Sequence, residues 1–118
     1  MNRLLATLVC VLPAYAFAET VDATGELGCD LVWTQGRRHV LEQAISDAFA
    51  ERMAGRETPE SARQRERNVA DLQDLLKAGN CRPLEGRFQV LERRQYLGWS
   101  AIKVRVSKTE YLWIAPLR

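Results

Sequence analysis

The spacing of apolar residues changes once along this chain, near Pro83, and this change limits the class of fold. Before Pro83, apolar residues recur every three or four positions, which is the period of a helix with one buried face. After it, they alternate with polar residues, which is the period of a strand with one buried face. Helices followed by strands predict an α+β fold.

Two helices are expected in the first half of the chain. The first runs from Arg38 to Ala54, and Gly55 stands where a helix commonly ends. Thr58 and Pro59 match an N-cap followed by a first helical residue. The short connection predicts an antiparallel helical hairpin over residues 37–79. The apolar stripe of its first helix consists of Leu41, Ala44, Ile45, Ala48, Phe49 and Met53.

The second half predicts a small antiparallel β-meander over residues 84–116. Strands are expected to begin at residue 88 and to cover residues 102–107 and 111–114, with turns at residues 93–95 and 107–109. Three strands are too few to close a barrel, so one apolar face needs a cover. We therefore expect the helical hairpin to pack on this sheet.

The first eighteen residues have the pattern of a secretory signal peptide. Arg3 precedes an apolar run over residues 4–12, and Ala16 and Ala18 are small residues at the positions that a signal peptidase recognises. The run is too short to span a membrane. We expect cleavage after Ala18, a periplasmic or secreted protein without membrane insertion, and a flexible leader over residues 19–28.

Cleavage would leave two cysteines, Cys29 and Cys81, for which a single disulfide is the simplest interpretation in an exported chain. A redox pair commonly has Cys-x-x-Cys spacing, which is absent, and a zinc site needs four ligands. His39 is the only histidine. The sequence therefore predicts one disulfide-tied domain over residues 29–118, with no metal and no cofactor.

Charge is unevenly distributed along a chain whose formal net charge is only +2. Residues 19–80 hold 8 basic and 12 acidic residues, whereas residues 81–118 hold 8 basic and 3 acidic residues. The small total argues against a nucleic-acid partner. The local excess predicts a basic sheet surface.

Three short runs of the second half, residues 81–93, 102–106 and 111–114, resemble the bacterial SH3-like family. The resemblance implies a small barrel-like sheet in an envelope protein that acts beside cell-wall-binding or cell-wall-cutting partners, with no specific ligand. Residues 107–111 depart from the family's Gly-x-x-Gly-Trp-Val turn. The first strand of a barrel is missing unless residues 30–33, which fit a strand or the start of a helix, supply it.

Cations and aromatic residues of the predicted sheet are the candidate binding residues. Alternation should place the cations on the polar side of the strands, where they either contact an anionic polymer, lipid headgroups or an acidic peptide, or remain solvated. Trp99 fits either a contact residue at a loop tip or a plug over the sheet edge. The candidates are Arg87, Tyr96, Trp99, Lys103, Arg105 and Tyr111.

No motif for catalysis accompanies these residues. His39 has no serine or cysteine nucleophile motif near it in the sequence. We therefore expect a non-enzymatic binding module for an envelope protein or peptidoglycan, of undetermined oligomeric state. The alternatives are an inhibitor or immunity-type protein that blocks a partner's active site through residues 96–100, and a small cell-wall hydrolase.

Overall fold

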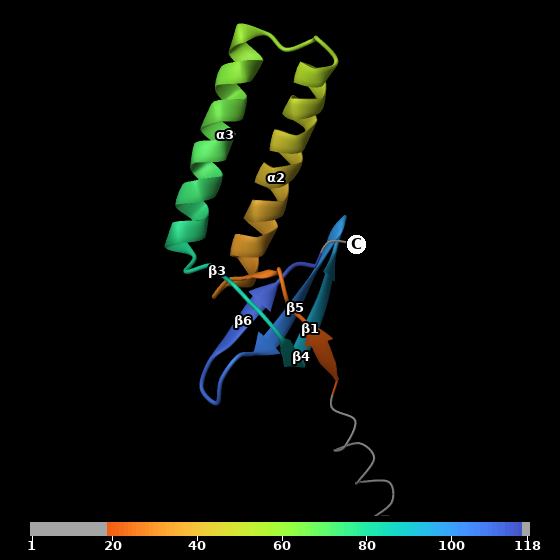
Figure 1. The fold of residues 1–118 in the computed structure, drawn as a ribbon, viewed down its shortest axis with the longest axis vertical. Helices are drawn as coiled ribbons and strands as arrows, with labels where there is room; N and C mark the ends of the chain where they lie inside the picture. Colours follow the sequence, from red (N-terminus) through yellow and green to blue (C-terminus); the bar gives the residue numbers. More distant parts are fainter. Residues whose placement is uncertain (1–18, 117–118) are drawn as a thin grey trace, which may run out of the picture.

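The computed structural model describes residues 19–116, and the predicted signal peptide lies outside this range. It confirms an α+β fold in which an antiparallel helical hairpin adjoins a small antiparallel sheet (Figure 1). The elements in chain order are β1 (Thr20–Asp22), β2 (Leu27–Gly28), α2 (Val32–Met53), α3 (Pro59–Ala78), β3 (Arg82–Pro83), β4 (Arg87–Tyr96), β5 (Trp99–Arg105) and β6 (Tyr111–Ile114).

The two helices lie side by side and extend away from one end of the sheet (Figure 1). Helix α2 begins at Val32, before the expected start at Arg38, so residues 30–33 lead into a helix and supply no strand. Gly55 follows the end of α2 with φ of 74°, a value that glycine adopts easily. Thr58 caps α3 as predicted, because its hydroxyl accepts a hydrogen bond from the Ser61 N–H.

The main sheet has four antiparallel strands in the order β1-β4-β5-β6. The flexible leader expected over residues 19–28 is wrong, because this segment forms β1, which pairs with β4, and β2, which pairs with β3. Strands of two or three residues are too short to display an alternating pattern. Val21 of β1 packs against the hydrophobic core, and this contact holds the segment in place.

The turn between β4 and β5 differs from the expected one at residues 93–95, which belong to β4. Residues 97–98 connect the strands instead, and Gly98 has φ of 84°, a value that glycine adopts easily. A bulge between Val90 and Glu92 shifts the register midway along β4. The expected turn at residues 107–109 is confirmed.

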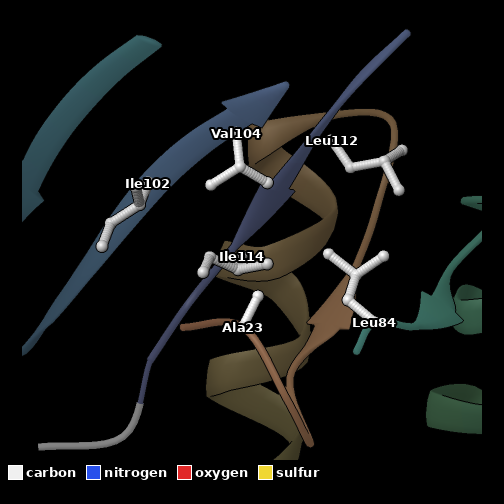
Figure 2. Packing of buried hydrophobic residues seen from close by; sticks show 6 residues of the cluster. All are labelled: Ala23, Leu84, Ile102, Val104, Leu112 and Ile114. Atoms are coloured by element: carbon white, nitrogen blue, oxygen red, sulfur yellow. The ribbon is translucent and has the colours of Figure 1, made fainter. Parts of the chain in front are cut away.

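The hydrophobic core lies on one face of the main sheet. Figure 2 shows Ile102 and Val104 of β5 with Leu112 and Ile114 of β6 facing two residues from outside the main sheet. Those two residues, Ala23 and Leu84, come from the segments beside β2 and β3. In the described part of the chain the cluster contains no helix residue, so the segments around β2 and β3 supply the cover that was expected from the hairpin.

The hairpin contacts the sheet through the first turns of α2, at a junction that includes the disulfide. The predicted bond between Cys29 and Cys81 is confirmed, with an S–S distance of 2.06 Å. The Cys29 N–H donates to the Trp113 carbonyl at 2.9 Å, and the Trp113 N–H donates to the Cys29 carbonyl at 2.8 Å. The fully buried Gln35 amide donates to the carbonyls of Leu27 and Trp113, both at 2.7 Å. These bonds tie the base of the hairpin to the last strand.

Candidate binding surface

The face of the main sheet opposite the core, called the outer face here, gathers all six predicted site residues. In β5, Trp99, Lys103 and Arg105 alternate with the core residues Ile102 and Val104. The strand pairing places the other three on this same side. Tyr96 is opposite Trp99, and Tyr111 is opposite Arg105. Arg87 lies two residues before Gln89, which is also opposite Arg105. The grouping follows from strand alternation and is independent of any ligand.

Cations on this face lie over aromatic rings. The Lys103 ammonium nitrogen is 3.9 Å from the ring centre of Tyr111 and 5.8 Å from that of Trp113. The guanidinium of Arg94 lies 4.8 Å from the Trp113 ring centre. Arg94 is paired with Ala101, whose small side chain leaves room for the guanidinium to reach β6. Both distances to the nearest ring fall within the range of a cation–π interaction.

Positive charge exceeds negative charge on the outer face. Tyr96 and then Glu92, by accepting hydrogen bonds from Arg94, raise the pKa of its guanidinium. Asp22 lies opposite Arg87, and hydrogen bonds from Thr24 hold the pKa of the Asp22 carboxyl below its usual value. The described cations are Arg87, Arg94, Lys103 and Arg105, against the two carboxylates of Asp22 and Glu92.

Trp99 connects the sheet to α2. Its ring stacks on Tyr96, with ring centres 4.4 Å apart and planes 11° apart, and on His39 at 6.1 Å. A Cβ atom at Gly36 would lie 2.8 Å from Trp99 Cζ2, so only glycine permits this approach. Trp99 is the first residue of β5 and is half-buried against the helix, so it is not a loop tip.

An open apolar groove lies where α2 meets the Tyr96–Trp99 pair, and it is called the junction groove here. Its volume is about 420 Å³. Trp33 and Val40 contribute large apolar side chains that are 60% and 56% exposed. Arg37 is the one charged residue of the lining and forms no ion pair within residues 19–116. The lining consists of Val32, Trp33, Gly36, Arg37, Val40, Tyr96 and Trp99.

A second cavity of about 420 Å³ also borders Trp99, and it contains His39 together with Gln95 and Ser100. No hydrogen bond joins His39 to Ser100 in the described structure. Among residues 19–116, no three histidine, cysteine, aspartate or glutamate side chains are grouped so that they could hold a metal ion. The arrangement at Trp99 suits contact and packing, and it presents no assembled set of catalytic groups.

Sequence reasoning missed the helical half of this surface. Trp33, Gly36 and Val40 lie on one side of α2, but the expected helix began after Trp33 and Gly36. A start at Val32 would have shown an aromatic residue, a glycine and a valine at helical spacing. Arg94 was missed because residues 93–95 were assigned to a turn, and Trp113 was expected in a strand but not named among the candidates.

Comparison with protein-family models, with curated proteins and with solved structures gives no match. The SH3-like resemblance therefore stays a prediction. Within residues 19–116, neither helix combines the length and the apolar character needed to cross a membrane.

Proposed function

We propose that this chain is an exported, non-enzymatic binding protein that holds an envelope protein against its outer face and junction groove. The observation that carries the proposal is the placement of exposed Trp33 and Val40 beside the stacked Tyr96–Trp99 pair. Contiguous exposed apolar surface marks contact sites, and the centres of protein interfaces are enriched in Trp, Tyr and Arg.

Export is part of this proposal. The disulfide between Cys29 and Cys81 is typical of oxidising compartments, and residues 1–18 have the composition of a signal peptide. The crosslink also supports a binding role, because it holds the base of the hairpin and the sheet in one arrangement before a partner arrives. Such preorganisation reduces the entropy cost of association.

A protein partner fits the surface better than peptidoglycan does. Sugar rings would stack on open aromatic faces, whereas Trp113 is only 5% exposed and has Arg94 and Lys103 over its ring. Lys103 also occupies a face of Tyr111. The groove exposes Trp33 and Val40 side by side, and these suit the apolar side chains of another protein.

The test is affinity capture from an envelope extract on the immobilised, oxidised chain. We expect Lys103→Glu and Trp33→Ala each to reduce recovery of the bound protein, whereas Lys77→Glu, at an exposed position near the end of α3, leaves it unchanged. Sedimentation with isolated sacculi is run in parallel. Equal recovery by all variants, or binding to sacculi without any protein partner, would refute the proposal.

One observation favours an inhibitor as the second candidate. Leu97 is fully exposed at the turn between β4 and β5, where an apolar side chain at a narrow tip suits insertion into an enzyme cleft. This candidate predicts a one-to-one complex with an enzyme that loses activity when bound. Leu97→Asp would then abolish inhibition, whereas Lys103→Glu would leave it intact. Inhibition that survives Leu97→Asp contradicts this candidate.

A further inference from the structure

We infer that the junction groove receives one bulky apolar side chain from an extended segment of the partner, and that acidic residues flank this side chain. The inference rests on the proposed function and deepens it by naming the chemistry of the partner segment.

The groove walls define what enters. Trp33 and Val40 of α2 form one wall, and the Tyr96–Trp99 pair of the sheet faces them. A volume of about 420 Å³ is within the range of sites that bind small molecules, and the groove is open to solvent. An open apolar groove of this size favours a side chain anchored with its adjoining backbone, such as a phenylalanine, tryptophan or leucine of the partner.

The sheet side of the groove is packed on several sides, which suits an anchor site. Trp99 is held between Tyr96 and His39, with centre distances of 4.4 and 6.1 Å, and its edge lies against Gly36. Aromatic side chains held in one rotamer lose little conformational entropy when a partner binds. Interface residues that fill such preformed pockets carry a large share of the binding energy.

Charge around the groove selects acidic flanking residues. Arg37 lies in the groove lining and has no ion-pair partner within residues 19–116. From Tyr96 and Trp99 the surface continues onto the outer face, where Arg87, Arg94, Lys103 and Arg105 outnumber Asp22 and Glu92. A basic flanking segment would be repelled, whereas an acidic one gains attraction and faster association.

A second copy of the chain is a poor occupant of the groove, because its most exposed apolar residue has basic and not acidic neighbours. Leu97 is fully exposed, but Arg93 and Arg94 precede it closely in the sequence. These cations would approach Arg37 if Leu97 entered the groove of another copy. Self-association is therefore treated as an outcome of the test and not as the expected result.

The experiment selects binders of the oxidised full chain from a library of random twelve-residue peptides. Fluorescence anisotropy then measures the affinity of each selected peptide for the chain. We expect them to share an aromatic residue or leucine with aspartate or glutamate beside it. Val40→Glu should weaken binding by about tenfold or more, since it places a charge in the anchor site. Phe49→Glu, at a similarly exposed apolar position farther along α2, should change nothing.

A charge reversal tests the second half of the inference. Arg37→Glu should weaken the binding of acidic peptides and strengthen the binding of peptides with lysine in the flanking positions. Arg63→Glu on α3 is the matched control and should change neither affinity. Selection of peptides without an apolar anchor or without acidic neighbours overturns the inference. So does equal binding by Val40→Glu, or a dimer of the chain that Val40→Glu dissociates.

Failure of the inference is distinguishable from failure of the proposed function. If capture of an envelope protein is lost with Lys103→Glu and retained with Val40→Glu, the groove takes no apolar anchor and the inference is wrong, while binding of a protein through the outer face stands. If the unmodified chain captures no protein, the proposed function is wrong as well.

Discussion

The sheet with its junction and the distal part of the hairpin are stabilised in different ways. Nearly all buried side chains belong to the first region, including Leu112, Ile114 and Gln35, whereas α3 contributes none. Leu41 is the last buried residue of α2 among the described positions. The distal hairpin therefore depends on helix capping and on half-buried helix–helix contacts, and the sheet depends on long-range packing.

This difference implies that the two regions do not unfold with the same free energy. Segments with few buried contacts open at lower cost than the core does. The proposed binding surface lies on the stable side of this boundary, because Trp99, Tyr96 and Gly36 are held beside the disulfide-tied junction.

The largest effect is expected from removing the disulfide. Cys29→Ser with Cys81→Ser should lower the free energy of unfolding by about 4 kcal/mol, from the entropy of a loop that spans 52 residues. Urea denaturation of the double variant and of the oxidised chain measures the difference. Since the bond lies at the junction, both regions should lose stability, and an unchanged denaturation midpoint would contradict this account.

A smaller loss is expected at the buried amide of the junction. Gln35→Ala removes two hydrogen bonds to the Leu27 and Trp113 carbonyls and should lower the free energy of unfolding by about 2 kcal/mol. Gln43→Ala is the matched control, because Gln43 only bonds to exposed Asp47, and its effect should stay within about 0.5 kcal/mol. Similar losses for both variants would show that the junction is not a special point of attachment.

Removing the cap of α3 should affect the hairpin alone. Thr58→Ala deletes the hydroxyl that accepts from the Ser61 N–H and should cost about 1 kcal/mol of local stability. Hydrogen exchange should accelerate in the first turns of α3 and remain unchanged at Val104 and Leu112. Equal acceleration in both regions would mean that the molecule opens as one cooperative unit.

The smallest effect concerns the ion pair between Glu19 and Arg93, which ties the start of the described chain to β4. The hydrogen bond from Arg93 lowers the pKa of the Glu19 carboxyl from its usual 4.5. The folded state therefore gains stability above that value and loses it as the pH falls below. The gain is small because the pair is exposed.

Thermal melting between about pH 6 and pH 3 measures this contribution. Glu19→Gln should slightly reduce the loss of Tm on acidification, because folded and unfolded states no longer differ in protonation at this position. Glu85→Gln, at an exposed position outside the strands, is the control. An identical pH profile for Glu19→Gln and the unmodified chain would remove the ion pair from the account.

Contiguous signals of the sequence predicted most of the elements. Thr58 with Pro59 marked the start of α3, and the two cysteines marked the crosslink. The alternation over residues 102–107 marked the second half of β5, which begins at Trp99 and ends at Arg105. Each depends on residues that are neighbours in the chain or on a pair with one possible connectivity. The cations Arg87, Lys103 and Arg105 were also assigned to one side of the sheet, because alternation is a local property.

Features that depend on distant partners were not predictable in this way. Strand β1 has three residues, and it is defined by pairing with residues 87–89 rather than by its own pattern. The turn at residues 97–98 became evident only once β4 was seen to continue to Tyr96. The junction groove needs a helix start at Val32 and a tryptophan far along the chain.

The two helices followed by an antiparallel sheet, the capping residues of the hairpin, the disulfide and the common side of the basic strand residues followed from the sequence alone. These properties arise from backbone periodicity and from interactions between close neighbours. Only the tertiary structure decided that segments beside β2 and β3 cover the sheet and that Gly36 meets Trp99. Such contacts depend on how complementary shapes meet across long sequence distances, and no short pattern of residues encodes that fit.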